Sequence, residues 1–200
     1  MGREILKRLE VHRSVTEVGA FVRREPPPEV AKLSTKTKFL VTDFARLPES
    51  HPCLAADVVI SALGTTIRKA GSQAAFRAVD HDIPVKVASF ARQKGATQCF
   101  VVSALGADSE SPVFYNRVKG EIEAALRALH FPKLVIVRPS VLVGERDEAR
   151  PLEAIAQVAG KLLPKKWRSV PAGHVAEAVV TGMIGLPPGE HVIENEKLFP

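Results

Sequence analysis

The sequence predicts an α/β fold, in which a doubly wound parallel sheet is covered by helices on both faces. Two observations lead to this class: apolar strand-like runs alternate with helical stretches, and these runs are nearly continuous in Val, Ile and Phe. The composition agrees, because 200 residues with 46% hydrophobic and 25% charged side chains are enough to bury a core. No repeat, low-complexity tract or linker divides the chain, so we expect residues 1–200 to form a single domain.

Six short apolar runs predict the strands. Most end in a polar residue, Gly or Pro, which is typical of strands buried inside a parallel sheet. The first run is followed by Arg23, Arg24 and three prolines, and the prolines cannot continue regular pairing. The last run is expected at an edge of the sheet. The predicted strands are residues 15–22, 39–41, 58–61, 100–103, 134–137 and 191–194.

Helices are predicted around these strands. The first ten residues place Ile5, Leu6 and Leu9 on one face at helical spacing, so the sequence starts inside a helix. A second helical stretch is interrupted near Pro84, because proline removes a backbone hydrogen bond. The predicted helices are residues 1–10, 73–94, 115–129, 151–163 and 174–184.

The charge balance limits the partners. Lys and Arg number 28 against 22 Asp and Glu, which gives a net charge of +6, and the basic residues are scattered rather than blocked. This pattern suits anionic small molecules as well as polynucleotides. The basic segment 162–168 holds the only tryptophan, but a solvated loop explains it better than nucleic-acid contact. We therefore expect a small-molecule substrate and no nucleic acid.

Cysteine, histidine and hydropathy patterns limit the compartment. Cys53 and Cys99 follow no metal-ligand spacing and cannot form a disulfide framework, and the six histidines show no ligand spacing, so no metal site is expected. No apolar run approaches the ~20 residues of a membrane helix, and the first residues do not resemble a signal peptide. These observations predict a cytoplasmic protein that does not contact a membrane.

Three residues form the candidate catalytic group. Tyr115 is the only tyrosine, and Lys119 lies one helical turn later on the same face. A nearby cation favours phenolate, and moving the pKa of tyrosine from ~10 toward ~7 takes about 4 kcal/mol of differential stabilisation. Ser103, at the carboxyl end of its strand, is placed to hydrogen-bond a substrate carbonyl beside the phenol. The alternative is an exposed helical pair and a serine that caps a turn.

These three residues resemble the triad of the short-chain dehydrogenase/reductases. The resemblance extends to atypical members related to the Tat-interacting oxidoreductase-like proteins, and it implies a Rossmann-like fold. It implies that Tyr115 is the general acid/base, that Lys119 lowers the pKa of Tyr115 and holds the nicotinamide ribose, and that Ser103 polarises the carbonyl. The segments that carry it are VVISALGTT (58–66), AFRAVDHD (75–82), FVVSALGAD (100–108), FYNRVKGEIE (114–123) and VRPSVLVGERDEARP (137–151).

The resemblance also assigns a cofactor path across the strand ends. Arg23 and Arg24 favour NADP over NAD, because a guanidinium can pair with the 2′-phosphate through two hydrogen bonds. Without the family, a solvated loop is an equal alternative for this pair. Asp57 and Asp80 are interpreted as capping or turn residues. The other residues assigned to the cofactor are Asp43, Ser61, Ala62, Leu63, Gly64, Arg138, Pro139 and Ser140.

One family feature is missing from the sequence. A member is expected to open with a strand and a Gly-x-x-Gly-x-x-Gly turn that holds the pyrophosphate, and only Gly2 resembles part of it. In the strand order 3-2-1-4-5-6 that strand is central, so the strands at 15–22 and 58–61 lack their shared neighbour. Three alternatives stay open: these strands close up, another segment or chain fills the gap, or the shortened sequence folds poorly.

The function expected from these observations is an NADP-dependent oxidoreductase that acts on a carbonyl or alcohol, with Tyr115 as general acid/base. All three alternatives for the gap weaken dinucleotide binding and with it activity. The competing hypothesis is a non-catalytic module with the same fold that senses NAD(P) or binds another protein. The sequence predicts neither the substrate nor the oligomeric state.

Overall fold

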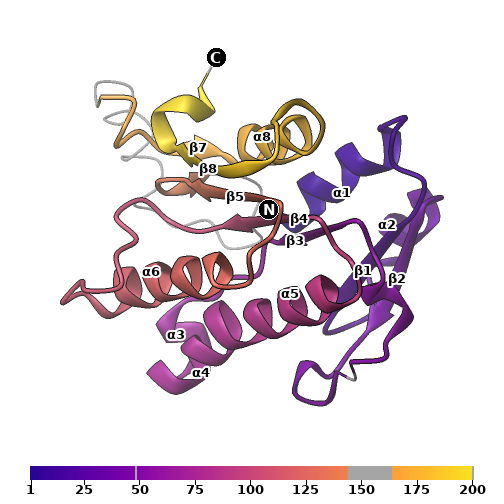
Figure 1. The fold of residues 1–200 in the computed structure, drawn as a ribbon, viewed down its shortest axis with the longest axis horizontal. Coiled ribbons are helices and arrows are strands. Elements are labelled where there is room, and N and C mark those ends of the chain that lie inside the picture. Colours follow the sequence, from indigo (N-terminus) through magenta and orange to yellow (C-terminus); the bar gives the residue numbers. More distant parts are fainter. Residues whose placement is uncertain (48, 144–163, 200) are drawn as a thin grey trace.

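The computed structural model describes residues 1–47, 49–143 and 164–199, and it has the α/β architecture that the sequence predicts (Figure 1). Its larger sheet has four parallel strands in the order β3-β4-β5-β8. A second parallel sheet pairs β1 with β2. The strands are β1 (Val18–Val22), β2 (Thr37–Val41), β3 (Val58–Ser61), β4 (Gln98–Val102), β5 (Lys133–Arg138) and β8 (Gly189–Glu194), with a small pair β6 (Leu142–Val143) and β7 (Val170–Pro171).

Helices cover both faces of the four-stranded sheet. Figure 1 shows α1 (Gly2–Val11) and α8 (Ala172–Gly185) on one face, and α5 (Ile83–Gln93) and α6 (Phe114–Arg127) on the other. The remaining helices are α2 (Pro28–Leu33), α3 (Ile67–Ala70), α4 (Gln73–Arg77), the 3-10 turns η1 (Phe44–Arg46), η2 (Pro52–Leu54) and η4 (Asn195–Leu198), and the π-helical turn η3 (Ala78–Asp82).

Alternating side chains of the central strands build two cores, because successive residues of a strand point to opposite faces. Phe100 and Val102 of β4 pack with α1 and α8. Cys99 and Val101, which alternate with these two residues along β4, pack with α5 and α6. Burial raises the pKa of the Cys99 thiol to about 12, so this cysteine behaves as a small apolar core residue.

Several predicted boundaries need correction. The strand predicted over 15–22 begins only at Val18, and the proline segment leads directly into α2, where Pro28 occupies the first turn. Pro84 does not break its helix, because it also lies in a first turn, where its missing N–H costs no hydrogen bond. The irregularity is instead η3, just before it. The helix predicted over 151–163 lies outside the described residues.

A cleft of about 1360 Å³ lies between the two sheets, lined by both β1 and β3. Within the described ranges, no strand lies between β1 and β3, and each pairs along one edge only. The two strands therefore do not close up, which removes one of the three alternatives. Over the same ranges, no helix has the length and apolar composition required to cross a membrane.

Candidate functional site

The candidate catalytic residues lie just after β4 and on the helix that follows it. Ser103 follows β4 directly, and the chain then turns into α6, whose first turns carry Tyr115 and Lys119. Glu123 continues the same four-residue spacing along α6, so these three helical side chains lie on one face. The Ser103 hydroxyl reaches this face through a hydrogen bond to Glu123.

A close approach of backbones holds the loop after β4 against α6. The Asp108 N–H donates to the carbonyl of Asn116 over 3.0 Å. A Cβ atom on Gly120 would lie 2.0 Å from the backbone nitrogen of Ser109, closer than any real contact. Gly120 is therefore required for this packing, which positions the segment between Ser103 and Tyr115. The sequence analysis did not identify Gly120.

The surroundings of Tyr115 favour its neutral phenol. Its ring packs against Phe76 with the ring centroids 5.8 Å apart. Burial raises the pKa of Tyr115, and the negative charge of Asp80 raises that pKa further. The resemblance implies the opposite direction, with Lys119 lowering this pKa. Burial is the larger cause of the raised pKa and Asp80 the smaller one, and the Lys119 ammonium is itself paired with Asp80.

Lys119 is paired with a buried carboxylate. Its Nζ lies 2.7 Å from Oδ1 of Asp80, and both side chains are almost completely buried. The charge of the ammonium is therefore compensated by a residue that the sequence analysis interpreted as a capping or turn residue. Asp80 lies in η3, and π-helical turns occur frequently at functional sites.

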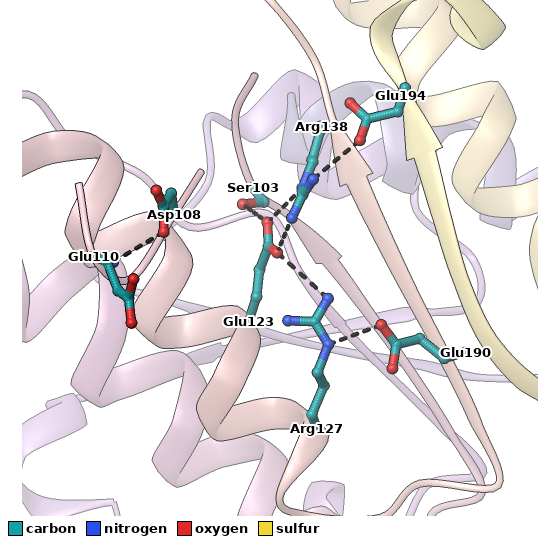
Figure 2. Close-up of polar contacts among 8 residues, drawn as sticks. All are labelled: Ser103, Asp108, Glu110, Glu123, Arg127, Arg138, Glu190 and Glu194. Atoms are coloured by element: carbon teal, nitrogen blue, oxygen red, sulfur yellow. Dashed lines mark hydrogen bonds and ion pairs between the residues drawn. The ribbon is translucent and has the colours of Figure 1, made fainter. Parts of the chain in front are cut away.

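Glu123 joins Ser103 to Arg138, as Figure 2 shows. Ser103 Oγ donates to Glu123 Oε1 over 2.6 Å, and Arg138 donates to both carboxylate oxygens over 3.0 and 2.6 Å. Arg138 also donates to Glu194 over 3.0 Å. These carboxylates raise the pKa of Arg138, with the Glu123 hydrogen bond as the main cause. The donor groups of Ser103 and Arg138 are thus engaged within the protein.

The network continues to Arg127, the last residue of α6. Arg127 Nε donates to Glu190 over 2.8 Å and its Nη2 lies 3.7 Å from Glu123 (Figure 2). Glu123 is almost completely buried, whereas Glu190 is largely exposed. The sequence analysis missed Glu123, although its spacing after Tyr115 and Lys119 was a usable signal.

The residues assigned to the cofactor fall into two groups. Arg24, Ser61, Ala62 and Leu63 line the cleft between the sheets, together with Gly2. Gly64 lies beside them, and a Cβ atom there would be 3.7 Å from Asp80 Oδ1.

The remaining assigned residues do not line this cleft. Asp43 lies 3.7 Å from Arg46 in an exposed ion pair. The Pro139 carbonyl accepts from Leu105, and the Ser140 N–H donates to Asn195 Oδ1 over 2.7 Å. Asn195 is fully buried and was also missed from the sequence, because its partners are remote in the chain.

The arginines after β1 fit an anionic group. Arg23 and Arg24 line a hollow of about 360 Å³, and neither forms an ion pair with another described residue. Their charges are therefore available to a phosphate. In the described part of the chain, no group of three or more His, Cys, Asp or Glu side chains is placed to hold a metal ion.

Comparison with curated sequences identifies clear relatives, although no protein-family model matches the chain. This chain is 34% identical over 199 residues to "Protein fmp52, mitochondrial" of Emericella nidulans, and the alignment covers 98% of this chain and 85% of that protein. It is 37% identical over 164 residues to "Protein HTATIP2" of Rattus norvegicus, which covers 80% of this chain and 67% of that protein.

The names of these relatives overturn the expected cytoplasmic location. Proteins from Emericella nidulans, Eremothecium gossypii, Candida albicans and Aspergillus niger are all named as mitochondrial. The expectation relied on the absence of an apolar leader. That criterion detects secretory signals, whereas mitochondrial targeting segments are amphipathic and basic.

Comparison with solved structures shows the fold. "MoeE5 in complex with UDP-glucuronic acid and NAD" aligns with a TM-score of 0.70 at 14% identity, covering 96% of this chain and 73% of that one. A "Putative NAD-dependent epimerase/dehydratase from Bacillus halodurans" aligns with a TM-score of 0.69 at 19% identity, covering 98% and 92%. The Rossmann-like architecture is therefore confirmed.

Proposed function

Because the chain belongs to the family of the FMP52 and HTATIP2 proteins, which are atypical short-chain dehydrogenase/reductases, we propose that it is an NADP-dependent oxidoreductase acting on a carbonyl or alcohol. One observation carries the proposal. Tyr115 and Lys119 lie one turn apart on α6, and Ser103, which directly follows β4, hydrogen-bonds to Glu123 on the same face of that helix. In parallel α/β sheets, ligands bind at the carboxyl ends of the strands.

In this proposal Tyr115 exchanges a proton with the substrate oxygen. Its phenol is protonated at neutral pH, so it is ready to act as a general acid. Ser103 lies on the same face and would contact that oxygen once its hydroxyl is released from Glu123. The nicotinamide cofactor would supply or accept the hydride. Its 2′-phosphate would be held by Arg23 and Arg24, whose availability for ion pairing supports NADP.

Substitution of the phenol oxygen tests the catalytic role. Tyr115→Phe keeps the ring contact with Phe76 and removes only the exchangeable proton. We expect turnover of carbonyl substrates, followed by NADPH absorbance, to fall by roughly 100-fold or more, because general acid–base catalysis contributes about 10²–10⁴-fold. Binding of NADP, measured by calorimetry, should stay within about twofold. Unchanged turnover in a variant that binds NADP would contradict the role of Tyr115, whereas NADP binding without any turnover in the wild-type protein would favour the non-catalytic sensing module.

Substitution at the arginine pair tests the choice of cofactor. Arg24→Gln should weaken NADP binding by roughly tenfold and leave NAD binding unchanged, because only NADP carries the 2′-phosphate. Arg13→Gln removes the same charge from an exposed position outside the cleft and serves as the matched control. Equal losses for both cofactors would assign Arg24 to another part of the nucleotide. Absence of binding of either cofactor to the folded chain would refute the proposed function.

A further inference from the structure

Asp80 is a buried carboxylate to which the proposed function gives no role. Its side chain is 1% exposed, and it lies in the π-helical turn η3 between α4 and α5. Leaving water is costly for a carboxylate, so its partners must compensate the charge. Those partners come from two other parts of the candidate site.

The two oxygens of Asp80 bind different elements. Oδ1 lies 2.7 Å from the ammonium of Lys119 on α6. Oδ2 accepts a 2.8 Å hydrogen bond from the backbone N–H of Thr65, in the turn that follows β3. The residues that lead into that turn line the cleft. They are Ser61, which ends β3, and Ala62 and Leu63. Asp80 therefore connects the lysine of the candidate triad to the cleft on its cofactor side.

The surroundings of Tyr115 explain why this pairing matters. Asp80 lies in η3, and its negative charge disfavours the phenolate. Lys119 lies one turn further along α6, but its positive charge is compensated by Asp80. From α4 the phenol meets Phe76, whose ring is uncharged. Burial acts in the same direction as Asp80, so the neutral phenol is favoured.

We propose that Asp80 is a positioning residue of this site, whose carboxylate holds Lys119 against the turn after β3 so that Tyr115 keeps its proton and the site is set for carbonyl reduction. This inference rests on the proposed function. In the step, the carbonyl carbon accepts a hydride from a reduced nicotinamide cofactor, and the oxygen takes the proton of Tyr115 as its O–H bond breaks. The substrate becomes an alcohol, the cofactor is oxidised, and the tyrosinate regains a proton from water.

The single tyrosine makes a direct test possible. The near-ultraviolet absorbance of the phenolate reports Tyr115 alone, without cofactor or substrate. Wild-type protein should titrate above the ~10 of free tyrosine. A midpoint at or below ~10 overturns the inference, whatever the activity of the protein. Circular dichroism recorded along the titration confirms that the chain stays folded.

Variants then assign the effect to Asp80. Asp80→Asn should lower the midpoint by about one pH unit, a tenfold change in the ionisation constant, because the variant removes the negative charge and frees the ammonium of Lys119. Asp80→Glu, which keeps the charge, should restore most of the wild-type midpoint. Asp82→Asn is the matched control, since this exposed carboxylate lies two residues away and should leave the midpoint unchanged. If Asp80→Asn does not fold, the wild-type midpoint still tests the inference, because a value at or below ~10 overturns it.

A kinetic measurement separates this inference from the proposed function. Reduction requires the protonated phenol, so its rate should fall as the pH rises through the pKa of Tyr115. Asp80→Asn should move this alkaline limb to lower pH by the same interval as the absorbance midpoint. A shifted midpoint without any turnover would refute the oxidoreductase proposal but retain the control of Tyr115 by Asp80. Turnover whose alkaline limb ignores Asp80→Asn would refute the positioning role alone.

Discussion

Two regions of the molecule differ sharply in burial. In the closed region, defined as β3, β4, β5 and β8 with α5, α6 and α8, nearly every residue of β4 and β5 is buried. In the open region, defined as β1, β2 and α2, only Thr37 of the two strands is fully buried. The candidate proton-transfer residues lie in the closed region. Arg23, Arg24 and Asp43 lie in the segments that directly follow β1 and β2 of the open region. The candidate proton-transfer residues therefore lie in the more buried of the two regions.

The largest difference between the regions should appear in core truncations. Phe100 of β4 is completely buried, and Phe100→Ala should lower the free energy of unfolding by about 3–5 kcal/mol, because it leaves a cavity beside α8. Phe39 of β2 is only partly buried, so Phe39→Ala should cost less than about half as much. Urea denaturation measures both losses. Similar losses would show that the open region is as tightly packed as the closed one.

A smaller effect should come from the carboxylate network of the closed region. Glu123→Gln removes the charge that pairs with Arg138, and it should destabilise the protein by about 3 kcal/mol, because the partly buried guanidinium loses its buried carboxylate partner. Glu190→Gln removes a largely exposed carboxylate from the same network and should cost at most about 1 kcal/mol. Thermal and urea unfolding compare the pair. Equal losses of unfolding free energy would mean that the different burial of these two glutamates does not determine their contribution to stability.

The smallest effect concerns the attachment of the open region to α1. Burial tends to raise the pKa of Glu10, but hydrogen bonds from Thr37, Lys36 and Thr35 outweigh it and lower that pKa below 4.5. A lowered pKa in the folded state means that this stabilisation is present above pH ~4.5 and is lost as the pH falls through the folded value.

Amide hydrogen exchange at Thr35 and Lys36 should therefore accelerate on acidification in the wild-type protein, after correction for intrinsic rates. Glu10→Gln should abolish this acceleration and cost less than about 1 kcal/mol, because these contacts lie at the surface. Exchange at β4 amides is the internal reference. A persisting acceleration in the variant would assign it to other acids.

The sequence predicts the closed region better than the open one. The strand at 58–61 is placed to the residue, because it is a continuous apolar run with polar Asp57 before it and Ser61 at its end, although its residues are only partly buried. The half-exposed β1 carries a weaker pattern, and its start was placed three residues too early. The proline-led α2 was missed, because prolines at 26–28 were interpreted as a loop alone.

The candidate site was predicted only in part for a related reason. The Tyr115 and Lys119 pair follows from local spacing within one helix. Asp80, Glu123 and Asn195 are buried polar residues whose partners lie 15 to 55 residues away in the sequence. Apart from the four-residue spacing of Glu123 after Lys119, nothing in a local pattern separates these residues from solvated ones. Their role follows only when the sheet brings distant strand ends together.

Gly120 has a consequence for mutational tolerance. It directly follows Lys119, and its missing side chain leaves the space that the backbone of Asp108 and Ser109 occupies. A saturation scan of α6 should therefore find position 120 as intolerant as the neighbouring positions that carry chemistry, although it contributes no functional group. Variant libraries intended to broaden substrate range should keep this position fixed and diversify the exposed residues around it.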